Sequence, residues 1–205
     1  MKNSFLVILT ILGIQQINAQ FTRRDSLQGG LRIERTSYDV KRYDLNITIN
    51  PEQKSIKGFN EITFEVLVPA QKIQLDLFEN MKVDSIVWNT KKLKYNRDND
   101  AVFIDFPEKL ASKSNHKLKF YYSGNPRIAR NAPWDGGFVF SKDKAGKDFI
   151  AVAVQGTGAS LWYPVKDSQT DEPDNGASIK VAVPNGLMNI SNGRFLGSQD
   201  LKNGY

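Results

Sequence analysis

Apolar and polar residues alternate in Tyr43-Asp44-Leu45-Asn46-Ile47-Thr48-Ile49, and they alternate again in Glu61-Ile62-Thr63-Phe64-Glu65-Val66, with Val68 next in the apolar set. Successive side chains of a β-strand point to opposite faces, so this period of two predicts two half-buried strands. The polar segment between them begins with Asn50-Pro51 and predicts a turn. The two strands are therefore expected to pair as an antiparallel hairpin.

Further apolar runs follow at short intervals, and polar residues, Gly or Pro separate them. The alternation shifts phase between Val40 and Tyr43, which predicts a β-bulge or a late strand start near Lys41. No segment keeps a helical period of about 3.6 residues over several turns, so helices are expected to be minor. Short, regularly spaced runs predict an all-β fold, an antiparallel sheet or sandwich. These runs are residues 73–77, 83–88, 93–95, 102–106, 118–122, 138–140, 149–154 and 179–183.

The run 149–154 is almost continuously apolar, which is typical of a strand buried on both faces. It leads into Gln155 and a glycine pair, Gly156 and Gly158, which can let the backbone bend sharply or approach a ligand closely. A dinucleotide-binding loop needs a third glycine and a following helix, and Pro164 leaves no room for that helix. Gln155 is then either a satisfied structural amide or a ligand contact, with two donors and one acceptor.

Composition limits the chemistry that this chain can carry out. Its 205 residues contain no Cys and one His, so they cannot build an ordinary zinc or copper site. A Cys nucleophile is excluded, and a Ser-His-Asp relay could use only His116. The net charge of +6 comes from scattered Lys and Arg residues. Scattered charge indicates solubility rather than nucleic-acid binding.

The first 19 residues resemble an export signal. Lys2 precedes an apolar stretch, residues 5–14, and Ala19 is a small residue suited to cleavage. The stretch is shorter than the roughly 20 apolar residues that span a bilayer, although a retained membrane anchor is the alternative. We therefore expect a signal peptide at 1–19, a lead-in segment at 20–37 and a β domain at 38–205, with no membrane span after cleavage. A disulfide-free exported chain favours a bacterial periplasmic or secreted protein.

Two other sets of polar residues could carry chemistry. His116 lies in a polar stretch without an acidic or second His neighbour in sequence, so we interpret it as an exposed turn histidine rather than a catalytic base. An acidic group, Asp167, Asp171, Glu172 and Asp174, could suggest calcium. The group lacks the spacing of an EF-hand loop, which favours a solvated loop or a turn cap.

Several segments together resemble a known family. The resemblance extends from about Tyr38 to the end of the chain, and the order and spacing of the segments carry it. The segments are Tyr43–Ile49, Ile56–Phe64, Ile73–Leu77, Met81–Val87, Leu118–Tyr122 with Gly124-Asn125-Pro126, Val154–Asp167, and Asp171-Glu172-Pro173-Asp174. They resemble the amino-terminal domain of the M1 family of zinc metallopeptidases, the aminopeptidase N and leukotriene A4 hydrolase group.

The resemblance implies a saddle-like β domain packed against a thermolysin-like catalytic domain. In the family, zinc is held in that second domain by a His-Glu-x-x-His helix and a distant Glu, beside a Gly-x-Met-Glu-Asn strand, and neither motif occurs in this chain. The resemblance also places Gln155 where family members contact the free α-amine of a peptide substrate. Trp162, Tyr163 and Pro164 are expected to pack. The extra residues 168–170, and Lys166 at a commonly aromatic position, leave the substrate preference open.

The leading expectation is the substrate-pocket and scaffold domain of an exported zinc aminopeptidase, cut before its catalytic domain and inactive alone. Such a domain should expose an apolar patch near Gln155, where the catalytic domain docks. Two alternatives stay open. One is a free-standing secreted β-sandwich that binds a peptide or glycan, and the other is a structural domain in a parent that has lost peptidase activity.

Overall fold

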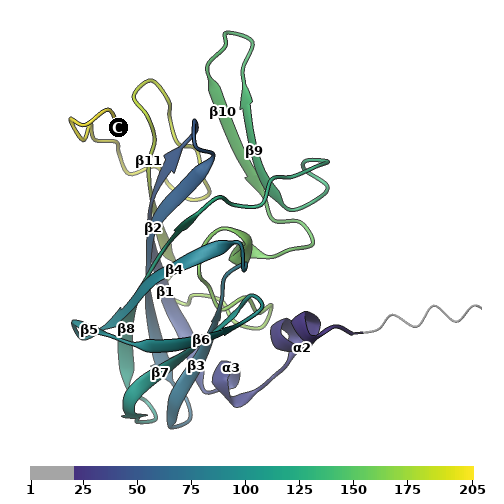
Figure 1. Cartoon of the computed structure of the whole chain (residues 1–205). Coiled ribbons are helices and arrows are strands. Elements are labelled where there is room, and N and C mark those ends of the chain that lie inside the picture. The colour runs from purple at the N-terminus through teal and green to yellow at the C-terminus, as the bar shows by residue number, and fades with distance from the viewer. Residues whose placement is uncertain (1–20) are drawn as a thin grey trace, which may run out of the picture.

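The structure is a computed structural model that describes residues 21–205 (Figure 1). The expected signal peptide, residues 1–19, lies outside the described residues. The described chain forms three β-sheets, with two short helices at its start. The mostly β architecture that the sequence predicts is confirmed.

The largest sheet has six strands in the order β11-β1-β2-β8-β4-β5. Every neighbouring pair is antiparallel except β11 and β1, which run parallel. A purely antiparallel sheet was therefore the wrong expectation at this edge. A parallel pair needs a long connection, and most of the domain separates β1 from β11 along the chain. The strands are β1 Tyr38–Asn50, β2 Ser55–Val66, β4 Met81–Trp88, β5 Lys91–Lys92, β8 Asn115–Gly124 and β11 Ala177–Ala182.

The predicted hairpin is the pair β1–β2. Tyr43 lies opposite Ile62, and the register shifts between Val40 and Arg42, which confirms a bulge near Lys41. Because of that shift, apolar residues on both sides of the bulge reach the same core, including Tyr38, Val40, Tyr43, Leu45 and Ile47.

A second sheet, in the order β3-β7-β6, covers one face of the first (Figure 1). Phe106 of β7 lies 5.4 Å from Trp88 and 6.2 Å from Phe64, measured between ring centroids, so aromatic side chains of both sheets meet in one core. This packing confirms the predicted sandwich for this part of the molecule. The three strands are β3 Ala70–Asp76, β6 Lys94–Asp98 and β7 Ala101–Leu110.

The third sheet is a two-stranded ribbon, β9 Gly137–Lys142 and β10 Asp148–Ala153, at the other end of the large sheet (Figure 1). The prediction of a strand buried on both faces is wrong for β10, because Phe149 and Val152 are 54% and 40% exposed. Within residues 21–205, β10 pairs only with β9, and no further sheet covers it. Its apolar run is left partly open to solvent.

The lead-in segment contains two short helices, α2 Arg23–Gly29 and α3 Ile33–Thr36. Thr22 and Asp25 form a capping box at the start of α2, since each side chain accepts the other's backbone N–H. Leu27 is buried, and both helices lie beside the second sheet (Figure 1). Among residues 21–205, no helix is long and apolar enough to cross a membrane.

Candidate functional site

Gln155 lies in a tight turn directly after β10. The N–H groups of Thr157 and Gly158 donate to the carbonyl of Val154 at 3.0 and 3.1 Å, which closes the turn. The Gln155 side chain is exposed, and its amide makes no hydrogen bond to any other described residue. Both of its donors and its carbonyl oxygen are therefore available to a ligand.

Two close backbone contacts, at Gly158 and at Gly136, support this turn. Gly158 has φ +78°, and a Cβ added there would lie 2.1 Å from Oδ2 of Asp167. On the other side, a Cβ added at Gly136 would lie 2.0 Å from Oγ1 of Thr157. Neither position has room for a side chain. The glycine pair therefore produces a bend and a close approach to Asp167, and not a phosphate-binding loop.

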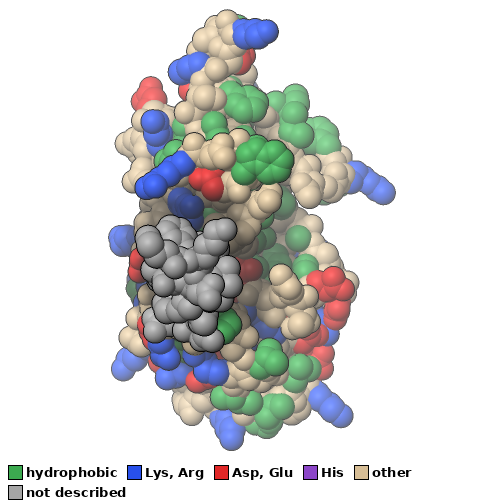
Figure 2. All heavy atoms as spheres, turned by 90° about the vertical axis from the view of Figure 1, so that its right-hand side faces the viewer, with side chains coloured by type: hydrophobic (Ala, Val, Ile, Leu, Met, Phe, Trp, Pro, Cys, Tyr) green, Lys and Arg blue, Asp and Glu red, His purple; other side chains and the backbone are tan. Residues whose placement is uncertain are grey.

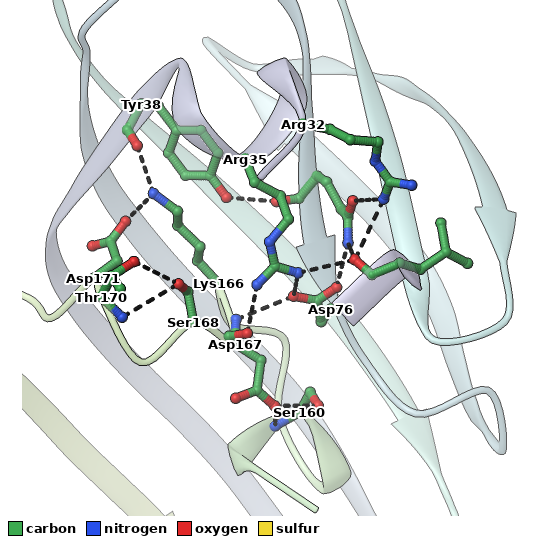
Figure 3. Close-up of polar contacts among 12 residues, drawn as sticks. Arg32, Arg35, Tyr38, Asp76, Ser160, Lys166, Asp167, Ser168, Thr170 and Asp171 are labelled. Carbon is green, nitrogen blue, oxygen red and sulfur yellow. Dashed lines mark hydrogen bonds and ion pairs between the residues drawn. The ribbon is translucent and has the colours of Figure 1, made fainter. Parts of the chain in front are cut away.

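Asp167 is fixed by groups from several segments. Its Oδ2 accepts hydrogen bonds from the backbone N–H of Ser160 at 3.2 Å and from the Ser160 hydroxyl at 2.6 Å. Its backbone N–H donates to Asp76 at 3.1 Å, and its carbonyl accepts from Arg35. Figure 3 shows these contacts converging between α3 and β3. Of the two roles expected for the acidic group, a solvated loop or a turn cap, Asp167 takes the second, because it accepts the N–H of Ser160 seven residues earlier.

Asp76 and Arg35 form a buried ion pair under Asp167. Arg35 Nη1 lies 2.9 Å from Asp76 Oδ2, and the two side chains are 3% and 1% exposed. Burial raises the pKa of Asp76 to about 6, and the positive charge of Arg35 opposes that rise. Gln74 also donates to the Asp76 carboxylate, at 2.7 Å. At neutral pH the carboxylate is ionised and paired.

Two of the remaining residues of that acidic group, Asp171 and Asp174, form ion pairs with lysines of the domain. Asp171 forms an ion pair with Lys166 and accepts the N–H of Val40, and Asp174 pairs with Lys41 at 2.7 Å. Asp171 has only 5% of its side chain exposed, so the prediction of a solvated loop is wrong for it. Its hydrogen bond to the Val40 N–H reaches a distant strand, so Asp171 is not a turn cap either.

Lys166 is buried rather than placed at a binding surface. Its Nζ donates to the carbonyl of Tyr38 at 2.6 Å and lies 4.4 Å from the centroid of the Tyr38 ring. The sequence resemblance led us to expect an aromatic residue at this position, and the lysine found here is accommodated inside the domain. Trp162 and Tyr163 pack against the core, as expected.

His116 is not an exposed turn residue, so that interpretation is wrong. It lies near the start of β8, half-buried, with its ring 5.6 Å from Phe64 and 5.7 Å from Trp88. Ser114 Oγ lies 2.7 Å from its Nε2. Burial lowers the pKa of His116. The residue fills an aromatic cluster of the sandwich, away from the turn that carries Gln155.

Comparison with solved structures places this fold in a class, the amino-terminal β domain of M1 metallopeptidases. A variant of an M1 zinc metallopeptidase from Deinococcus radiodurans, bound to a Tyr-Ser-Ala substrate, matches with a TM-score of 0.57 and 23% identity over 77% of this chain. Yeast LTA4 hydrolase in complex with bestatin matches with a TM-score of 0.57 and 14% identity over 75% of this chain. The chain covers only 37% and 24% of those two structures. No curated protein matches the sequence.

The family model of the Peptidase M1 N-terminal domain matches residues 39–205, and the chain belongs to this family. Zinc does not fit the residues present here. Residues 21–205 contain no group of three or more His, Cys, Asp or Glu side chains that could hold a metal ion. The whole chain has one His and no Cys, which are the usual zinc ligands. We therefore assign no zinc-dependent step to this chain.

Proposed function

We propose that this chain is the scaffold and one wall of the substrate pocket of an exported zinc aminopeptidase. Gln155 carries the proposal, because its unpartnered amide is presented on a supported turn of an M1 amino-terminal domain. In this role the side-chain carbonyl of Gln155 accepts a hydrogen bond from the α-ammonium group of a peptide. Hydrogen bonds from a charged donor are stronger than neutral ones, and exclusion of water strengthens them further.

Exposed apolar side chains beside this turn support docking to a catalytic domain. Trp134, Phe149, Val152 and Val154 are between 39% and 70% exposed, and all four belong to the β9–β10 ribbon or the loops next to it. Hydrophobic side chains also interrupt the polar surface in the upper part of the face that Figure 2 shows. Clustered apolar surface of this kind marks interaction sites. In the proposal it contacts a thermolysin-like domain of the same polypeptide, which holds the zinc.

The test of the substrate role is Gln155→Ala in the full-length parent. Loss of a hydrogen bond to a charged group should lower kcat/KM for an amino-acyl anilide by about 10- to 100-fold, mainly through KM. Gln53→Ala is the matched control, because Gln53 is also an exposed turn glutamine and its recorded hydrogen bonds involve only its backbone. Equal kinetics for wild type and Gln155→Ala would remove the role.

Two further measurements separate the proposal from its alternatives. The gene should encode a His-Glu-x-x-His motif in the region that follows Tyr205, whereas a free-standing binding module would have none. Export rests on the pattern of residues 1–19 alone. The protein should therefore be recovered from the periplasm or medium with Gln20 as its first residue; a start at Met1 would contradict cleavage, and confinement to the cytoplasm would contradict export.

A further inference from the structure

We propose that Asp167 is a positioning residue for Gln155, and that the buried Arg35–Asp76 pair holds Asp167 in place from the lead-in segment. The kinetic part of this inference rests on the proposed function, since it takes Gln155 as the substrate contact. The structural part does not, because it concerns only whether Asp167 fixes the turn.

The first step is the contact between Asp167 and the turn. Its Oδ2 binds the N–H and the hydroxyl of Ser160 and lies directly against Gly158. Ser160 is completely buried and follows Gly158 by two residues, so the carboxylate fixes the end of the turn that carries Gln155. A shift of Asp167 would change both the Ser160 bonds and the space under Gly158.

The second step is the support of Asp167 itself. The backbone of Asp167 is held at two points, because its N–H donates to Asp76 and its carbonyl accepts from Arg35. Arg35 comes from α3 and Asp76 from β3, and the two side chains are joined to each other in the interior (Figure 3). The lead-in segment is thereby connected to the Gln155 turn through a buried ion pair and a series of part-buried hydrogen bonds.

The third step is the asymmetry of the turn. Thr157 is held by its contact with Gly136, whereas Gly158 rests on Asp167. Loss of the Asp167 carboxylate would free the Gly158 side and loosen the hydrogen bonds that the N–H groups of Thr157 and Gly158 both donate to the Val154 carbonyl. We therefore expect a looser turn within an otherwise intact domain, and a Gln155 side chain that must be ordered when substrate binds. The cost of that ordering weakens binding.

The structural test is amide hydrogen exchange on the 205-residue chain. Asp167→Ala should accelerate exchange of the Thr157 and Gly158 amides by about tenfold or more, because these N–H groups close the turn. Asp143→Ala is the matched control, since Asp143 accepts the N–H of Ala145 and of Lys147 in the turn between β9 and β10. The control should loosen its own turn and leave Thr157 and Gly158 unchanged.

Unchanged exchange at Thr157 and Gly158 in Asp167→Ala would overturn the inference. If Asp167→Ala loses protection throughout the domain, Ser160→Ala decides, since it removes only the 2.6 Å hydroxyl bond. Ser160→Ala should accelerate the same two amides by about threefold, and equal rates in wild type and this variant would also overturn the inference. Asp167→Asn keeps an oxygen that can accept from Ser160 and should restore slow exchange.

The kinetic test uses a double-mutant cycle in the parent. Asp167→Ala should raise KM by about tenfold with kcat changed less than about twofold, and the same change added to Gln155→Ala should raise KM no further. Independent, multiplying effects on KM would contradict positioning through Gln155. If Gln155→Ala alone leaves KM unchanged while exchange at Gly158 accelerates in Asp167→Ala, the substrate role fails and the structural role of Asp167 stands.

Discussion

Asp76 shows how a single buried carboxylate joins three segments of this domain. It binds Arg35 of α3, Gln74 of its own strand and the backbone of Asp167. Burial makes its charge unfavourable, which is why its pKa rises to about 6, and the pair with Arg35 offsets that cost at neutral pH. A buried ion pair of this kind matters most when one partner is removed, because the other charge then stays in the interior unpaired.

Asp76→Asn is therefore expected to destabilise the chain strongly. The free energy of unfolding in urea at pH 7 should fall by about 3–5 kcal/mol, since the Arg35 guanidinium loses its counter-ion. Asp105→Asn is the control, because Asp105 pairs with Lys72 at 3.2 Å on the surface, with 44% and 47% of the two side chains exposed. The control should lose less than about 1 kcal/mol. Equal losses in the two variants would contradict the role of Asp76.

His116 makes the stability of the domain depend on pH in a defined direction. Burial lowers its pKa, so the folded chain binds the proton less tightly than the unfolded chain. The stability that neutral His116 contributes is fully present above its ordinary pKa of about 6.5 and is lost as the pH falls through the lowered value. Wild type should therefore lose more unfolding free energy between pH 7 and pH 5 than His116→Phe. Parallel pH curves for the two proteins would exclude this contribution.

Individual residues were predicted unevenly from the sequence. Gln155 was identified through the family resemblance and lies exposed on a turn, and its role as a ligand contact stays a prediction. Asp167 was assigned to a solvated loop or a turn cap, and sequence spacing did not show which, or that Ser160 folds back onto it. Asp76 and Arg35 were missed. Apolar and polar residues alternate over residues 73–77, a pattern that predicts a solvent-facing side for Gln74 and Asp76, whereas all of residues 73–76 are buried and Arg35 of the lead-in pairs with Asp76.

Among the elements, strands that pair locally were the easiest to predict. The β1–β2 hairpin and its bulge follow from alternation within one continuous segment. The parallel pairing of β11 with β1 joins segments more than a hundred residues apart, and no local pattern encodes it. The exposure of β10 was also hidden, because a partly exposed strand can have the same apolar composition as a buried one.

Gly58 in β2 is an element-level requirement of that hairpin. It lies opposite Ile47, and a Cβ added there would be 1.9 Å from the Asn46 carbonyl oxygen. Gly58→Ala should force β1 and β2 apart and lower the unfolding free energy by about 1–3 kcal/mol, measured by urea denaturation. Gly29→Ala is the control, since nothing lies within 4 Å of a Cβ there, and its effect should stay within about 0.5 kcal/mol. A Gly58→Ala chain as stable as wild type would show that the close approach is not required.

The molecule as a whole combines a well-filled sandwich with an exposed ribbon. At one end, the two larger sheets share a continuous aromatic and aliphatic core. At the other, β9 and β10 present apolar side chains and the Gln155 turn to solvent (Figure 1). The first part explains why the chain folds. The second part supports the proposal that it works together with another domain.

The proposed roles of this chain and of a separate catalytic domain can be tested directly with an amino-acyl anilide and added zinc. The account predicts colour release by the full-length parent and none by the 205-residue chain at the same concentration, because the chain has one His and no Cys and its residues 21–205 form no group that could hold a metal ion. Hydrolysis by the purified chain alone would contradict the central claim that it forms a wall of the pocket and not the catalytic centre.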